Sequence, residues 1–239
     1  MADPKVETSP QVVARIGGVL YLIVIASGTL IEAAVRDKLI VSGDAAATAG
    51  NIMASQLVWR ASIAGELVAQ VCTVALALVF YVLLRPVSRN LALLALLFNL
   101  VSVAIEVANS LNLFAALFLL GSADYLKAFD PNQLHALAYL SLKSQGYGFG
   151  ISLVFFGCEC LVLGYLIFRS GYLPKILGVL MQIAGLCYLI NSFALFLSPA
   201  FENMIFPAVL IPSFIGESSL CLWLIVKGVN VAKWEARLG

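Results

Sequence analysis

The chain has 239 residues, of which 62% are hydrophobic and only 11% are charged. A soluble domain is about half apolar and about a quarter charged, so this composition is too poor in charge to cover a surface in water. The net charge of +1 gives no basic field that would attract nucleic acid. We therefore expect an integral protein of a lipid bilayer and no nucleic-acid partner.

Six apolar runs are each long enough to cross about 30 Å of hydrocarbon as a helix that rises about 1.5 Å per residue. We expect these helices at about residues 12–34, 58–84, 90–120, 147–168, 174–197 and 206–227. The sequence therefore predicts an all-α fold, a single bundle of six transmembrane helices within residues 12–230. Residues 1–11 are polar and are expected to form a disordered tail, and residues 231–239 a cytoplasmic tail.

Two of the connections between these runs are short and polar. Residues 85–90 and 169–175 should each join two successive helices in a hairpin. Gly171 is expected to end the fourth helix and Pro174 to open the fifth, since these residues are typical of those positions. Helices two and three, and helices four and five, should therefore be antiparallel neighbours.

Two other connections are longer. In residues 42–56, Asp44 is placed to cap a short helix. In residues 129–143, Asp130 should cap a helix whose leucines recur every three residues, which predicts an amphipathic segment on the membrane surface. His135 in this segment is the only histidine of the chain. It is expected at the surface, and one histidine cannot supply the ligands of a zinc site.

Lysine and arginine are distributed unequally between the two sides of the predicted bundle. Of the 14 such residues, nine fall on the side of the two termini and five on the other. Connections rich in lysine and arginine stay in the cytoplasm, so both termini are expected there.

Three stretches of sequence at helix ends carry a family resemblance. They are GDAAATAGNI after the first helix, YVLLRPVSRNLALLA at the first elbow and FRSGYLPKILGVL at the second. Together they resemble the bacterial membrane proteins grouped as domain of unknown function 4386, over about residues 12–230. The resemblance implies a multi-pass protein of the bacterial inner (plasma) membrane. It implies no activity, no cofactor and no catalytic residue.

Glutamates inside the apolar runs are the most informative residues. Glu66, Glu106, Glu159 and Glu217 lie within runs, and Glu32 lies near the end of one. An ionised side chain at the centre of a membrane helix costs at least about 2.5–3.5 kcal/mol. By residue count, Glu106, Glu159 and Glu217 should lie near mid-depth and the other two nearer the outside. Since no lysine or arginine is expected at that depth, their partners should be amides, hydroxyls, water or protons.

Polar residues at helical spacing extend this pattern on two helices. Asn99, Glu106 and Asn109 recur on one face of the third helix, and Glu66 and Gln70 on one face of the second. We therefore expect one polar site in the bundle interior. Its candidate residues are Glu66, Gln70, Asn99, Glu106, Asn109, Glu159 and Glu217.

Three interpretations of the glutamates remain open. They could form a binding or translocation site for a proton, a cation or a small amphiphile. They could only hold helices together, as in a structural or regulatory membrane subunit. They could also be catalytic, although the sequence has no catalytic motif that supports an enzyme. The first interpretation is preferred as a function, with no metal and no cofactor.

Small residues and one proline predict how helices pack. Glycines recur every seven residues on the fourth and fifth helices, which should therefore pack closely along these stripes. The six glycines are Gly150, Gly157, Gly164, Gly171, Gly178 and Gly185. Pro212 either kinks the sixth helix beside Glu217 or begins a shorter helix, and both alternatives stay open.

Overall fold

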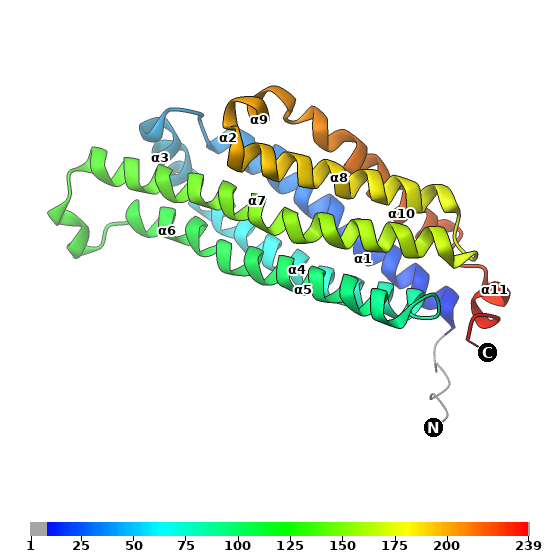
Figure 1. Ribbon diagram of the computed structural model, residues 1–239. Coiled ribbons are helices and arrows are strands. Elements are labelled where there is room, and N and C mark those ends of the chain that lie inside the picture. Colours follow the sequence, from blue (N-terminus) through cyan, green and yellow to red (C-terminus); the bar gives the residue numbers. More distant parts are fainter. Residues whose placement is uncertain (1–8, 239) are drawn as a thin grey trace.

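The computed structural model describes residues 9–238, and its long elements are helices that follow the predicted apolar runs (Figure 1). Within that range, six segments are long and apolar enough to cross a membrane: Pro10–Leu39, Gln56–Leu84, Arg89–Leu119, Pro131–Ser170, Lys175–Leu197 and Ala208–Val226. The predicted all-α fold with six membrane-spanning helices is confirmed. Residues 1–8 of the predicted N-terminal tail lie outside the described residues.

Three spans consist of one helix each, namely α4 (Gln56–Leu84), α7 (Pro131–Ser170) and α8 (Lys175–Leu197). Three others are composite: α1 (Pro10–Ile31) with η1 (Glu32–Arg36) and α2 (Asp37–Leu39), α5 (Arg89–Asn109) with α6 (Leu111–Leu119), and η3 (Ala208–Leu210) with α10 (Ile211–Val226). Short helices lie in the connections, namely α3 (Ala45–Ala54), η2 (Asp124–Ala128) and α9 (Pro199–Ile205). The short helix α11 (Val231–Glu235) follows the last span.

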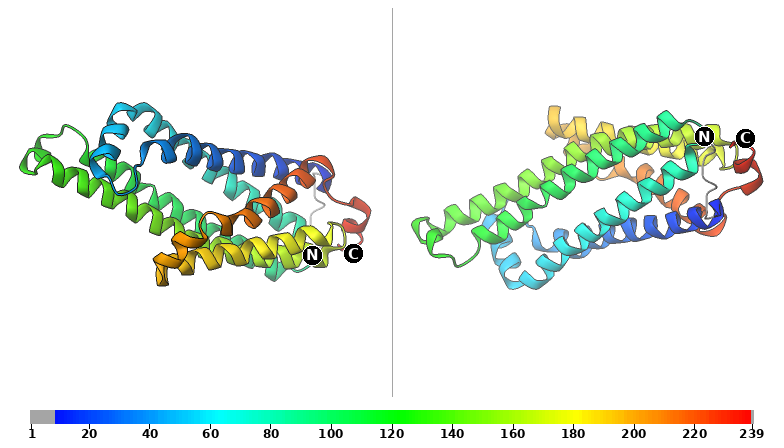
Figure 2. Two further views of the ribbon diagram at one scale, coloured as in Figure 1. Left: turned by 90° about the horizontal axis from the view of Figure 1, so that it is seen from above. Right: turned by 90° about the horizontal axis from the view of Figure 1, so that it is seen from below.

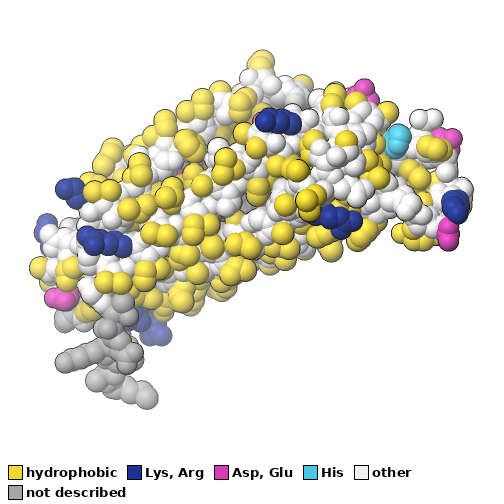
Figure 3. Space-filling model, turned by 180° about the vertical axis from the view of Figure 1, so that it is seen from behind, with side chains coloured by type: hydrophobic (Ala, Val, Ile, Leu, Met, Phe, Trp, Pro, Cys, Tyr) yellow, Lys and Arg dark blue, Asp and Glu magenta, His cyan; other side chains and the backbone are white. Residues whose placement is uncertain are grey.

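The six spans form a closed ring. Following the ring, α1 packs on α4, α4 on α5, α5 on α7, α7 on α8, α8 on α10, and α10 again on α1 (Figure 2). Hydrophobic side chains cover most of the visible outer face between the two ends of the molecule (Figure 3). The ring therefore presents apolar side chains to lipid and has an interior that six helices share.

The first and last helices meet at one end of the bundle, which we call the terminal end (Figure 1). The side chain of Gln11 donates to the carbonyl oxygen of Lys227 at 2.9 Å and accepts from the backbone N–H of Val229 at 3.0 Å. Within the predicted C-terminal tail, α11 places Trp234 in the interior, where its indole donates to the carbonyl oxygen of Leu83 at 2.9 Å. This segment therefore closes the terminal end.

Two apolar cores fill the bundle at different depths. The terminal core combines buried side chains of all six spans and α11, including Leu83, Leu166 and Leu224. The distal core, at the opposite end, is built around Ile52 and Trp59 of α3 and α4, with side chains of α6 and the beginning of α7. The interior glutamates belong to neither core.

The long helix α7 differs from the prediction. Asp130 caps it as expected, and its capping box with Gln133 is complete. However, the helix continues through all 40 residues to Ser170, so the predicted amphipathic segment on the membrane surface is wrong. Ala138 and Leu142 are buried in the distal core instead. No proline follows Pro131 within α7, and α3 and α6 offer its apolar face a partner inside the protein.

The predicted glycine contact between the fourth and fifth helices is confirmed. A Cβ atom added at Gly164 would lie 2.6 Å from the carbonyl oxygen of Gly178, and one at Gly157 would lie 3.0 Å from that of Gly185. The backbones of α7 and α8 therefore touch, as small residues permit in membranes. Gly171 ends α7 with a φ of 77°, a conformation that favours glycine.

The third and sixth spans also bear on expectations about helix continuity. The third span is not one helix, because α5 ends at Asn109 and α6 begins after Ser110. Pro212 lies in the first turn of α10, so it begins a short helix rather than kinking a longer one.

Candidate functional site

Interior polar side chains meet across facing helices of the ring, and three of them lie at one depth. Asn99, Glu159 and Glu217 are each ten residues from a basic residue at the terminal end of their span, namely Arg89, Arg169 and Lys227. Ten helical residues cover about 15 Å, which is half of the roughly 30 Å of hydrocarbon. We call this group, with its partners, the middle layer.

Glu159 of α7 is almost fully buried, with 3% of its surface exposed. Its carboxylate accepts a hydrogen bond of 2.8 Å from the side-chain amide of Asn99 on α5. The amide oxygen of Asn99 is also buried and has no hydrogen-bond partner. The pair connects α5 with α7 and leaves the amide oxygen of Asn99 without a hydrogen bond.

Glu217 of α10 is the second buried carboxyl of the middle layer. The hydroxyl of Tyr188 on α8 donates a hydrogen bond to it, and the hydroxyl of Tyr21 on α1 also approaches it. Tyr21 is held in place by an edge-to-face contact with Phe80, with ring centroids 5.9 Å apart. Glu217 therefore collects hydroxyl groups from the two helices that flank α10 in the ring.

Glu106 lies in a second group, nearer the distal end. It is 17 residues from Arg89, which corresponds to about 25 Å along the helix. The expectation that Glu106 shares mid-depth with Glu159 is therefore wrong, because residue counts within apolar runs of unequal length misplace the helix ends. Glu106 accepts a hydrogen bond of 2.6 Å from the hydroxyl of Ser152 on α7.

Glu66 of α4 belongs to the same group as Glu106, and we call this group the distal layer. Unlike Glu106, Glu66 has a cationic partner. It forms a salt bridge with Arg36, whose guanidinium also lies 3.7 Å from the exposed Glu32. The expectation that no basic residue reaches the buried glutamates is wrong for Glu66. The first span continues through the π-helical turn η1, which brings Arg36 back against α4.

The two remaining candidates occupy different places. Asn109 donates to the backbone carbonyl of Gln145 at 2.8 Å and packs on Gly148, so it joins α5 to α7 beyond the distal layer. Gln70 is half-buried on α4, one turn from Glu66 on the side of the middle layer. Three of the seven predicted residues thus lie in the middle layer and two in the distal layer. Asn109 lies at a helix joint, and Gln70 lies between the two layers.

Four partners of the glutamates were missed from the sequence, namely Tyr21, Arg36, Ser152 and Tyr188. Ser152 could have been found, because it is seven residues before Glu159 and therefore on the same face of its helix. The tyrosines carried no such signal, since each meets Glu217 from a different helix.

Some buried hydrogen-bonding groups of the ring have no partner. Besides Asn99, they include the amide oxygen of Asn191 and the hydroxyl of Ser192 on α8. These two residues follow Tyr188 by three and four positions, so they extend the face of α8 that meets Glu217. Buried polar atoms are normally satisfied by protein, water or an ion. These three atoms are therefore buried hydrogen-bonding groups that the protein itself does not satisfy.

A family model described as a domain of unknown function (DUF4386) matches residues 16–228 of the chain. An uncharacterized protein of the archaeon Archaeoglobus fulgidus is 33% identical over 173 residues, which cover 72% of this chain and 86% of that protein. No solved structure matches the chain.

Proposed function

We propose, from the premise that this chain belongs to the DUF4386 family, that it is a multi-pass membrane module which binds a proton at Glu159 and Glu217. The observation that carries the proposal is the chemistry of their partners. Both carboxyls are buried at mid-depth, and they are bonded to an amide and to hydroxyls rather than to cations. A charge in such a place is costly, and a bound proton removes it.

The distal layer supplies a path by which a proton reaches this pair. Glu66 and Glu106 are only partly buried, whereas Glu159 and Glu217 are buried. Ser152, the partner of Glu106, and Glu159 share one face of α7 and are separated by seven residues, or about 10 Å. Asn99, whose amide oxygen has no hydrogen-bond partner, lies along the same seam between α5 and α7.

The charge distribution gives this path a direction. The side of the termini carries the larger share of lysine and arginine, so the terminal end faces the cytoplasm. We place the protein in the bacterial inner membrane, with the distal layer toward the outside. On this proposal the protein is a binding or transport module rather than an enzyme, and protons enter from the distal side.

Infrared spectroscopy of the protein in lipid nanodiscs tests the proposal. A protonated buried glutamate gives a carbonyl stretching band, which should change in a pH titration of the parent protein. The band should lose intensity in Glu159→Gln and in Glu217→Gln. Glu235→Gln is the matched control, because Glu235 is exposed on α11. A spectrum that is the same in all four proteins would overturn the proposal.

A structural subunit is the second candidate, and one observation favours it. Each of the four interior glutamates bonds to a neighbouring helix of the ring, which is what a packing role requires. Proteoliposomes with an internal pH dye distinguish the two. If the parent protein moves no protons and shows no pH-linked infrared band, while the glutamine variants melt at lower temperature, the packing role holds.

A further inference from the structure

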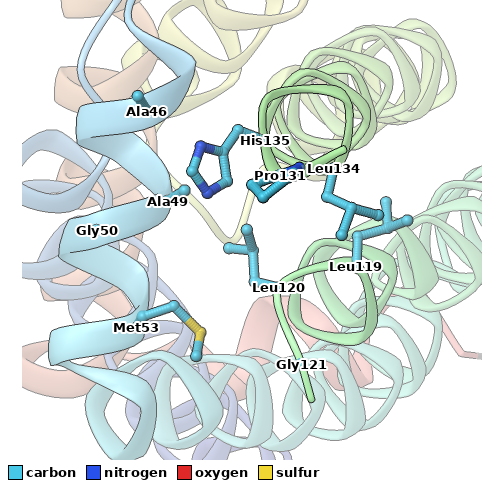
Figure 4. A pocket seen from close by; sticks show the side chains of 10 residues that line it. All are labelled: Ala46, Ala49, Gly50, Met53, Leu119, Leu120, Gly121, Pro131, Leu134 and His135. Carbon is cyan, nitrogen blue, oxygen red and sulfur yellow. The ribbon is translucent and has the colours of Figure 1, made fainter. Parts of the chain in front are cut away.

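Pockets at opposite ends of the molecule differ in the charge of the side chains that line them. The distal pocket lies between α3 and the first turns of α7, and its side chains are apolar apart from His135 (Figure 4). The expectation of a surface histidine is wrong, because His135 is half-buried. A second pocket, which we call the terminal pocket, opens at the terminal end and is lined by cations instead.

The terminal pocket has a volume of about 320 Å³ and lies between the turn from α7 to α8 and the segment of α11 (Figure 1). Five residues line it, namely Ser170, Gly171, Lys233, Ala236 and Arg237. Two of the five are cationic and none is acidic. The volume is at the lower end of the range of small-molecule sites, so the pocket suits a group of the size of a lipid headgroup.

Several contacts hold the α11 segment against this turn. Trp234 is buried in the terminal core, and the backbone N–H of Asn230 donates to the carbonyl oxygen of Tyr172 at 3.1 Å. The guanidinium of Arg237 donates to the carbonyl oxygen of Arg169 at 2.9 Å. A guanidinium has five N–H donors, so most of those of Arg237 remain for a ligand. The cations of the pocket are therefore carried by a backbone that is already in place.

The positive charge of the terminal pocket is not neutralised by the protein. Within residues 9–238, neither Lys233 nor Arg237 forms a salt bridge. Glu235 is two positions from each of them, so it faces another side of the helix and does not line the pocket. An anion in the pocket would therefore meet two cations without acidic partners.

The depth of the pocket indicates which anion is at hand. Ser170 is the last residue of α7, one position beyond Arg169 at the terminal end of the span. The polar headgroup layer extends about 5–8 Å beyond the hydrocarbon on each side of a bilayer. The pocket therefore lies at the level of the lipid phosphates.

We infer that the terminal pocket binds a phosphate group, which an anionic phospholipid headgroup supplies. The guanidinium of Arg237 matches two oxygens of a phosphate, and the ammonium of Lys233 adds a compact positive charge. A choline headgroup would bring its own positive charge beside these cations, so an anionic lipid is favoured. A soluble phosphate ester carries the same group, and the experiment separates the two sources. This inference does not depend on the role of the glutamates.

Native mass spectrometry of the protein in detergent measures the binding of single lipids. The probe is phosphatidylglycerol, and phosphatidylcholine is the reference. We expect phosphatidylglycerol to bind more tightly. Lys233→Gln and Arg237→Gln should each weaken its binding about fivefold, and the double variant more than about tenfold. Lys175→Gln is the control, because Lys175 is an exposed cation at the same end that does not line the pocket. An equal loss in all these variants would show a diffuse effect of charge and would refute the pocket.

A charge placed in the pocket gives a second test that removes no contact. Ala236→Glu adds a carboxylate between the two cations and should abolish the preference for phosphatidylglycerol. Asn90→Glu is the matched control, because Asn90 is exposed at the same end of the bundle and should keep the preference. Both substitutions are at exposed positions, so both variants should melt like the parent protein. A preference that survives in Ala236→Glu would contradict the inference.

Inorganic phosphate is the probe for a soluble source. It should displace phosphatidylglycerol only in large excess, because the acyl chains of the lipid add apolar contacts outside the pocket. Displacement at equal concentrations would assign the pocket to a soluble phosphate ester and would rule out the lipid as its source.

Discussion

Asn99 and Glu159 are sixty residues apart in the chain, and the amide of the first donates a hydrogen bond of 2.8 Å to the buried carboxylate of the second. The bond joins α5 to α7 at mid-depth, beside Cys160 and Ala95 of the terminal core. Because both side chains are polar and buried, the hydrogen bond between them offsets part of the free-energy cost of burying each one. This pair is therefore the first point at which the proposed site can be tested.

Replacing Asn99 should weaken the bundle. Asn99→Ala removes the partner of Glu159 and should lower the free energy of unfolding by about 1–3 kcal/mol, the penalty of an unsatisfied buried group. Asn90→Ala is the control, because Asn90 is exposed in the first turn of the same helix. Thermal melting in detergent measures both variants. Equal melting temperatures would show that the bond contributes nothing to stability.

Adding a methyl group at the glycine contact between α7 and α8 should destabilise the protein. Gly164→Ala places Cβ 2.6 Å from the carbonyl oxygen of Gly178, so the helices must move apart, and we expect a loss of about 1–3 kcal/mol. Gly28→Ala is the matched control, since its Cβ would meet nothing within 4 Å. That control should be neutral or more stable, because alanine favours helix by about 0.5–1 kcal/mol. The two melting curves would contradict this account if they coincided.

The salt bridge between Arg36 and Glu66 should show strong coupling. Both side chains are largely buried, with 12% and 26% exposed, so a double-mutant cycle with Arg36→Gln and Glu66→Gln should give about 1–3 kcal/mol. The exposed pair of Lys127 and Asp124 provides the comparison and should give about 0–1 kcal/mol. Chemical unfolding measures both cycles. A coupling for Arg36 and Glu66 no larger than that of the exposed pair would contradict the structure.

Tyr172, in the connection between α7 and α8, should make stability depend on alkaline pH. Its hydroxyl donates to the carbonyl oxygen of Leu83 at 2.6 Å, and burial raises its pKa well above the ordinary value. Above about pH 10 the unfolded chain releases this proton while the folded protein keeps it, so stability falls as the pH rises. Tyr172→Phe should melt at lower temperature at neutral pH and lose less stability between neutral and alkaline pH.

The control for this experiment is Tyr125→Phe, because Tyr125 is exposed in η2. It should follow the parent protein at every pH. If Tyr172→Phe also followed the parent protein, the buried hydrogen bond to Leu83 would not contribute to stability.

The sequence alone determined the number of spans, the all-α fold and several helix ends. These properties depend on neighbours in the chain, since a run of apolar residues must span the membrane and a residue such as Asp44 or Asp130 caps the helix that follows it. The contact of α7 with α8 was also predictable, because glycines at a spacing of seven leave a smooth face wherever the helix lies.

Only the tertiary structure decided which polar groups meet. It brought Arg36 to Glu66, brought Tyr188 to Glu217, and separated Glu106 from Glu159 by depth. It also brought segments about eighty residues apart, Ala46–Met53 and Pro131–His135, together around one pocket at the distal end. Such contacts depend on the rotation, tilt and extent of each helix relative to its neighbours in the ring. Those quantities are set by packing across the whole bundle, and the periodicity of residues within one helix does not predict them.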